Sequence, residues 1–199
     1  MLLRQFMLEV GPFESNSWLL ADEETGEGLL LDAGGFSSDV VRLVETWGLH
    51  ISHILITHLH HDHIDGLPDY RRCWPQTRVV APAPIDGIDN AVLVAEGNRV
   101  QVGPFQFDVI RTSGHTPESI SYYCRSAGIC FVGDAVFAGA VGGTATDELF
   151  AEQKALILER LMTLPDGTLL LSGHGPATTV AIERAANPFL QPGFGRLAG

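Results

Sequence analysis

The sequence has few cysteines, and their spacing excludes two kinds of protein. Cys73, Cys124 and Cys130 are odd in number and form no Cys-x-x-Cys pair. We therefore expect neither a disulfide framework nor a zinc site built from thiolates. Cys124 and Cys130 could pair across a hairpin, but we interpret both as core residues, since free cysteine is usually buried. This usage of cysteine predicts a reducing, cytoplasmic location.

Basic residues and long apolar segments are also scarce. The 199 residues include 12 Lys or Arg against 24 Asp or Glu, a formal net charge of −12. No basic patch is available to displace counterions from phosphates, so we expect no nucleic-acid partner. No stretch approaches the roughly 20 apolar residues that span a bilayer, and the first residues lack the apolar segment of a signal peptide. We therefore expect no membrane partner and a small-molecule substrate.

The chain nevertheless has the composition of a folded protein. Hydrophobic residues make up 45% and charged residues 18%, and the length fits one domain, residues 1–199. Apolar runs and turn residues predict strands first, followed by mixed strands and helices. The strands are expected at residues 6–10, 17–21, 28–32, 51–56, 78–81, 99–102, 105–111, 120–124, 129–132 and 168–171, and the helices at 38–47, 64–70, 147–164 and 178–186.

A cluster of histidines follows the predicted buried strand 51–56. Residues 57–63 read Thr-His-Leu-His-His-Asp-His, which places four of the eight histidines beside one carboxylate. Such a cluster is costly to bury unless it binds something, and imidazole with carboxylate suits zinc, iron or manganese. On an extended loop His58 and His60 point the same way and can reach one ion, while Asp62 and His63 can turn towards a second.

Three isolated residues offer further ligands in matching contexts. His115 lies in Ser-Gly-His-Thr, Asp134 in Val-Gly-Asp and His174 in Ser-Gly-His-Gly, each shortly after an apolar strand and beside a glycine. Each can therefore stand at the edge of a sheet. Asp32 follows the run Leu29-Leu30-Leu31 and could cap a turn before Gly34.

These elements, in this order, resemble the metallo-β-lactamase superfamily, and within it the glyoxalase II-like (hydroxyacylglutathione hydrolase-like) branch. The resemblance extends from Asn16 and Asp32 to residues 173–179 and 187–189, so it covers most of the chain. It implies an α/β fold, the four-layer αβ/βα sandwich, with two mixed sheets and the helices outside. Only about 25 residues follow His174, so we expect no C-terminal helical substrate domain.

The resemblance also implies a ligand set and a mechanism. His58, His60 and His115 would bind one divalent metal, Asp62, His63 and His174 a second, and Asp134 would bridge the two. Asp62 and Asp134 are the expected catalytic carboxylates, Asp32 the outer carboxylate, and zinc the expected metal, with iron or manganese as alternatives. His61, His50 and His53 are expected to be ordinary polar residues. A hydroxide bridging the metals would attack a thioester or activated ester, and no serine nucleophile of the Gly-x-Ser-x-Gly type is present.

The substrate is not identified by this pattern. The loop at residues 137–144 resembles one in which shorter relatives often carry an arginine, and this chain has Gly143 there. The missing cation weakens the case for an anionic glutathione conjugate.

An oxygenase is the alternative function. Persulfide dioxygenases share this fold and hold one iron with two histidines and one carboxylate, which here would be His58, His115 and Asp134. The complete second set, Asp62, His63 and His174, favours the hydrolase over this alternative.

Overall fold

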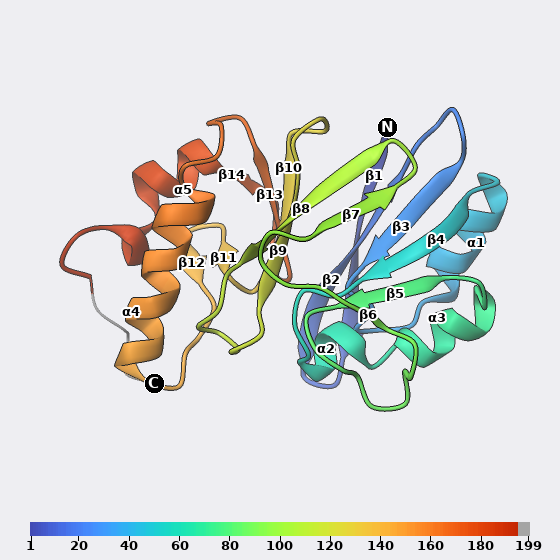
Figure 1. The fold of residues 1–199 in the computed structure, drawn as a ribbon, viewed down its shortest axis with the longest axis horizontal. Helices are drawn as coiled ribbons and strands as arrows, with labels where there is room; N and C mark the ends of the chain where they lie inside the picture. The colour runs from blue at the N-terminus through green and yellow to red at the C-terminus, as the bar shows by residue number, and fades with distance from the viewer. Residues whose placement is uncertain (195–199) are drawn as a thin grey trace. The chain divides into compact units, whose positions relative to one another are not determined.

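The computed structural model describes residues 1–194, and the chain divides into two compact units. The first comprises Met1–Val94 and Arg99–Gln106, and the second comprises Ala95–Asn98 and Phe107–Gly199. Figure 1 labels the elements of both units. The prediction of a single domain stays a prediction.

The first sheet is mixed and has six strands in sequence order (Figure 1). The pairs β1–β2 and β2–β3 are antiparallel, and the pairs from β3 to β6 are parallel. Its central residues Leu29, Leu30 and Leu31 are all buried, as expected for a strand that is covered on both faces. The strands are β1 (Leu2–Val10), β2 (Phe13–Ala21), β3 (Glu27–Leu31), β4 (His50–Leu55), β5 (Arg78–Ala81) and β6 (Val92–Leu93).

Helices α1 (Ser38–Thr46) and α3 (Leu67–Cys73) share one core with this sheet, and the short α2 (His61–Ile64) precedes α3. The Ser37 side chain caps α1 by accepting a hydrogen bond from the Asp39 N–H at 3.2 Å. The core joins helix residues such as Val40 and Tyr70 with strand residues such as Leu30 and Ile54. The apolar stripes of the two helices therefore cover one face of the sheet.

The second sheet is also mixed, with the order β14-β13-β10-β9-β8-β7. Strands β8, β9 and β10 are antiparallel, whereas β10 and β13 run parallel. Its strands are β7 (Arg99–Val102), β8 (Phe105–Arg111), β9 (Ile120–Cys124), β10 (Ile129–Gly133), β13 (Leu169–Ser172) and β14 (Thr178–Thr179), and β7 is grouped with the first unit. A separate hairpin pairs β11 (Val136–Phe137) with β12 (Ala140–Val141).

Helices of the second unit pack against its sheet through a core that includes Ile157, Leu161 and Val180. These elements are α4 (Asp147–Leu156), the π-helix η1 (Ile157–Leu161), α5 (Val180–Ala186) and the 3₁₀-helix η2 (Pro188–Leu190). The predicted fold class is confirmed, because both sheets are mixed and both carry helices. Within residues 1–194, none of the helices combines the length and apolar character that crossing a bilayer needs.

Three sequence-based expectations about elements were wrong in detail. The α-helix predicted at 147–164 ends at Leu156 and continues as η1, where the Met162 N–H bonds to the Ile157 carbonyl, five residues back. The helix predicted at 64–70 is divided into α2 and α3 by Gly66, which packs against Gly35. The first strand begins at Leu2 and not at residue 6, because the whole segment pairs with β2.

All three cysteines are free, as predicted for Cys124 and Cys130. In the β9–β10 hairpin Cys130 stands opposite Tyr123, and Cys124 stands opposite Ile129. Burial raises the pKa of the Cys130 thiol, so this thiol stays protonated and unreactive. Cys73, the last residue of α3, is exposed.

Candidate metal centre

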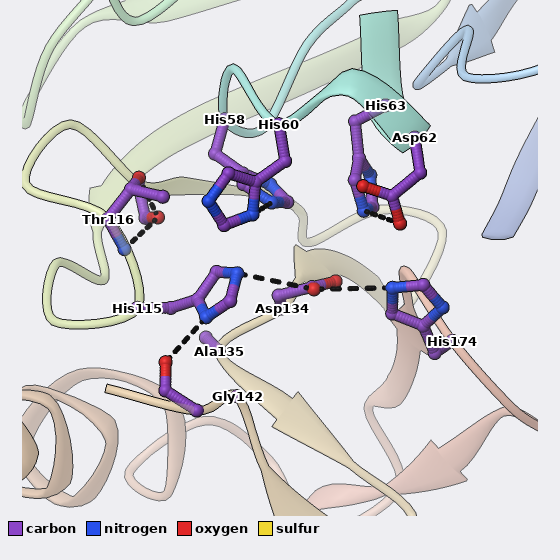
Figure 2. Close-up of polar contacts among 12 residues, drawn as sticks. His58, His60, Asp62, His63, His115, Thr116, Asp134, Ala135, Gly142 and His174 are labelled. Atoms are coloured by element: carbon purple, nitrogen blue, oxygen red, sulfur yellow. Dashed lines mark hydrogen bonds and ion pairs between the residues drawn. The ribbon is translucent and has the colours of Figure 1, made fainter. Parts of the chain in front are cut away.

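The first unit places four of the predicted ligands directly after β4. His58 and His60 lie on the loop that leaves the strand, and Asp62 and His63 lie on α2, not on an extended loop (Figure 2). His58 and His63 are fully buried, and their rings lie 4.1 Å apart between centroids. His58 Nε2 and His60 Nδ1 are 3.2 Å apart, and His63 Nε2 is 3.7 Å from Asp62 Oδ2.

Asp32 connects to two of these histidines. Its Oδ1 accepts the Thr57 N–H, and its Oδ2 accepts both the Thr57 hydroxyl, at 2.8 Å, and His63 Nδ1, at 2.9 Å. Because the Thr57 hydroxyl donates to Asp32, its oxygen can accept from His58 Nδ1, which lies 3.1 Å away. Both rings therefore carry their proton on Nδ1. The lone pair of Nε2 remains available to a metal ion.

The position of Asp32 follows from the sheet. Strands β3 and β4 are parallel neighbours, so the residues after their carboxyl ends meet at one edge. Asp32 has a φ of 51°, a left-handed conformation that Asp adopts more readily than most residues. The buried contacts of its carboxylate hold it in this conformation.

Glycines let the loop after β3 lie against α2. A Cβ at Gly34 would be 1.6 Å from the Asp62 carbonyl oxygen, so only glycine allows this approach. Backbone hydrogen bonds hold the two segments together: the Ala33 N–H donates to the His63 carbonyl, and the Gly66 N–H donates to the Gly34 carbonyl. The direction of α2, which carries Asp62 and His63, is fixed by these contacts.

The second unit brings together its three predicted ligands. Asp134 follows β10 and His174 follows β13, and these strands are parallel neighbours, so both residues stand at one edge of the sheet. Asp134 Oδ2 lies 3.4 Å from His115 Nε2 and 3.3 Å from His174 Nε2, with the carboxylate between the two rings (Figure 2). His115 Nδ1 lies 2.7 Å from the Gly143 carbonyl and donates to it, which leaves Nε2 directed at Asp134.

The separations within each unit fit metal ligands. Two atoms that each lie about 2.1 Å from one tetrahedral ion are about 3.4 Å apart. The pairs His58–His60, His115–Asp134 and His174–Asp134 have separations of 3.2, 3.4 and 3.3 Å. Imidazole nitrogens and carboxylate oxygens are also the donors that zinc, iron and manganese accept. Both halves of the donor set therefore fit divalent ions.

Two further histidines, His61 and His53, make polar contacts outside the predicted ligand set. The His61 side chain is 90% exposed and contacts Asp65 at 3.1 Å, on the wall of a hollow of about 450 Å³ beside α2. His53 contacts Ser52, and burial lowers the pKa of its ring.

The sequence did not point to Gln153, which is fully buried on α4. Its side-chain amide donates to the carbonyls of Ala135, at 3.3 Å, and Gly142, at 3.2 Å. The sequence did contain a signal for it. Gln153 is a polar residue in a series of apolar positions at helical spacing that are buried, namely Phe150, Ile157 and Leu161. A polar residue in such a stripe marks a buried hydrogen-bonding role.

Comparison with known proteins identifies the family of the chain. The family model described as "Metallo-beta-lactamase superfamily" matches residues 10–174. The chain is 34% identical to the "Probable metallo-hydrolase YqgX" of Bacillus subtilis, over 92% of this chain and 95% of that protein. It is 33% identical to a hydroxyacylglutathione hydrolase of Chromohalobacter salexigens over 84% of its length, and it spans 65% of that longer protein.

A solved structure agrees as well. ETHE1 from Myxococcus xanthus is 31% identical, with a TM-score of 0.80, over 94% of this chain and 84% of that one. The family match extends over more than half of the sequence and includes all seven predicted ligands. The chain therefore belongs to the metallo-β-lactamase superfamily.

Proposed function

We propose that this protein is a binuclear metal-dependent hydrolase that cleaves a thioester or a similarly activated ester. The observation that carries the proposal is the state of the histidine rings. His58, His63 and His115 each have Nδ1 hydrogen-bonded, to Thr57, Asp32 and Gly143, which leaves Nε2 of each as a metal donor. Rings that are oriented in this way are typical of metal ligands.

The proposed site combines donors from both units. His58, His60, His115 and Asp134 would hold one ion, and Asp62, His63 and His174 the other, with Asp134 shared between them. The proposal is supported by a family match that includes residues of both units. Asp32 would act through His63 and, by way of Thr57, through His58. Zinc is the metal we propose, and iron or manganese suits the same donors.

The chemistry follows from the donors. Two such ions, when bound, would supply Lewis acidity and lower the pKa of a bound water, so that a hydroxide nucleophile is available at neutral pH. Asp134, whose Oδ2 lies between His115 and His174, would contribute its carboxylate to both ions. Asp62 and Asp134 would balance the positive charge of the ions. Because the activated water would be the nucleophile, no Ser or Cys nucleophile is required. The two matched hydrolases support this class of reaction.

The proposed substrate is a small molecule. The net charge of −12 disfavours a phosphate backbone as partner, and three free thiols support a reducing compartment such as the cytoplasm. S-Lactoylglutathione is one candidate to test, because a matched relative is a hydroxyacylglutathione hydrolase.

Metal content together with a thioester panel tests the proposal. We expect two ions per chain by mass spectrometry, and thioester cleavage that disappears with chelator and returns when metal is added. His60→Ala should lose metal, whereas His61→Ala, an exposed neighbour in the same cluster, should keep both ions. Full cleavage by protein that holds no metal would contradict the proposal.

A mononuclear iron oxygenase is the second candidate. His58, His115 and Asp134 supply the two histidines and one carboxylate that such a centre needs, and the similarity to ETHE1 is compatible with it. A single iron per chain, with oxygen uptake and no thioester cleavage, would favour this reading over the hydrolase.

Gly143→Arg is expected to change substrate preference. A Cβ at Gly143 would meet no atom within 4 Å, so a side chain can start there without a clash, next to the carbonyl that accepts from His115. The added cation should lower the KM for an anionic thioester about three- to tenfold at low salt, through electrostatic attraction. Steady-state kinetics with anionic and neutral thioesters measure this effect.

Gly143→Gln serves as the uncharged control for that substitution. It should leave the KM of both substrates near the wild-type value. An equal change of KM for anionic and neutral substrates would show that shape, and not charge, governs this position.

A further inference from the structure

The loops that carry His115 and Asp134 meet at one buried side chain. Gly114 lies against Gln153: a Cβ at Gly114 would be 2.3 Å from the Gln153 Cβ, and the φ of Gly114 is 132°. Only glycine permits this contact. The residue directly before His115 is thus pressed against α4 at the position of Gln153.

The amide of Gln153 reaches the other two loops. It donates to the carbonyl of Ala135, the residue after Asp134, and to the carbonyl of Gly142, the residue before Gly143. The Gly143 carbonyl in turn accepts His115 Nδ1. One side chain therefore contacts the backbone beside His115, beside Asp134 and beside the acceptor that sets the His115 ring.

Gly142 is closely packed against the Asp134 backbone and the His115 ring. A Cβ there would be 2.0 Å from the Asp134 carbonyl oxygen and 3.1 Å from His115 Cγ. The segment after β12 therefore packs directly against both predicted ligands. A change in its position would move the Gly143 carbonyl relative to His115.

The far end of the β11–β12 hairpin is held independently. Glu183 is buried, and its Oε2 accepts the Gly139 N–H at 3.0 Å and the Asn187 amide at 2.8 Å, while Oε1 accepts the Thr178 hydroxyl. The Asn187 amide also donates to the Ala140 carbonyl at 2.9 Å. The turn of the hairpin is thus hydrogen-bonded to residues of α5 and its C-cap, and the segment after β12 is hydrogen-bonded to α4.

We propose that Gln153 is a positioning residue for the His115–Asp134 pair: its amide fixes the Gly142–Gly143 segment so that His115 presents Nε2, at ligand distance from Asp134. Gln153 acts through the backbone, because both acceptors of its amide are main-chain carbonyls. This inference rests on the proposed metal site, but it is independent of which substrate the enzyme cleaves.

Cobalt binding to Gln153→Met tests the inference. Methionine has a similar length but no donor, so both hydrogen bonds are lost while the volume is retained. We expect the affinity for one of two cobalt ions to fall about 10- to 100-fold, as for other residues that orient a metal ligand. The visible absorption bands of the cobalt protein should change as well. Competition with a chelating dye measures the affinity.

The control is Phe150→Leu, a packing change one turn earlier on α4 that leaves both amide bonds in place. It should lower thermal stability but keep the wild-type cobalt affinity and spectrum. If Phe150→Leu weakened cobalt binding as much as Gln153→Met, or if Gln153→Met bound cobalt normally, the inference would be overturned. If Gln153→Met does not fold, Gln153→Asn carries the test: its shorter amide can reach one carbonyl at most and should give a smaller loss of affinity. Wild-type protein that binds no cobalt would refute the proposed metal site itself.

Discussion

Asp134→Ala is expected to lower thioester cleavage by about 1,000-fold or more. Loss of a residue that only orients a ligand costs about 10- to 100-fold. A carboxylate placed between His115 and His174, and shared by both proposed ions, should cost more. Single-turnover and steady-state rates, with metal content determined on the same protein, measure the effect. Less than two ions per chain should remain bound.

The matched control is Asp166→Ala, which removes an exposed carboxylate paired with Arg184 in the same unit. Exposed pairs contribute little to stability, so cleavage should stay within about twofold of wild type. Cleavage that persists unchanged in Asp134→Ala, at full metal content, would refute the proposed mechanism.

Gly34→Ala is expected to disrupt the part of the first unit that carries the predicted ligands Asp62 and His63. The new methyl group would lie 1.6 Å from the Asp62 carbonyl oxygen and 2.8 Å from the Ser15 hydroxyl oxygen, so α2 must move or the fold must open. We expect the free energy of unfolding to fall by about 3 kcal/mol or more. Because α2 carries Asp62 and His63, metal binding should be lost even in the fraction that remains folded. Urea denaturation of metal-free protein and metal titration measure the two effects.

Gly143→Ala is the matched control, because a Cβ at Gly143 meets no atom within 4 Å. Its free energy of unfolding should lie within about 0.5 kcal/mol of wild type. Wild-type stability and metal affinity in Gly34→Ala would show that the close approach of Gly34 to Asp62 is dispensable.

The fold class and the candidate ligands could be predicted because their signals are local. His58, His60, Asp62 and His63 lie within six positions, directly after a strand recognisable from its apolar run. Asp134 and His174 each follow a glycine at the end of an apolar strand. The parallel pairing of β10 and β13 then brings the two to one edge.

What the sequence could not predict depends on contacts between distant segments. The partners of Gln153 lie 11 and 18 residues away, and the Thr57 partner of Asp32 lies 25 residues away. Periodicity predicted one long helix at 147–164, because apolar residues recur on both sides of Leu156 and the pattern does not reveal the change in backbone hydrogen bonding at η1. It also could not show that α2 begins at His61, since four residues are too few to display a helical pattern.

Because one thiol is exposed and two are buried, the number of alkylated thiols per chain reports unfolding. Cys73 is exposed at the end of α3, whereas Cys124 and Cys130 are buried in the second sheet. A maleimide should therefore label one thiol per chain while the fold is intact and three once it opens, and mass spectrometry distinguishes the two products directly. The same reactive thiol offers an attachment point for a fluorophore on the first unit without any substitution.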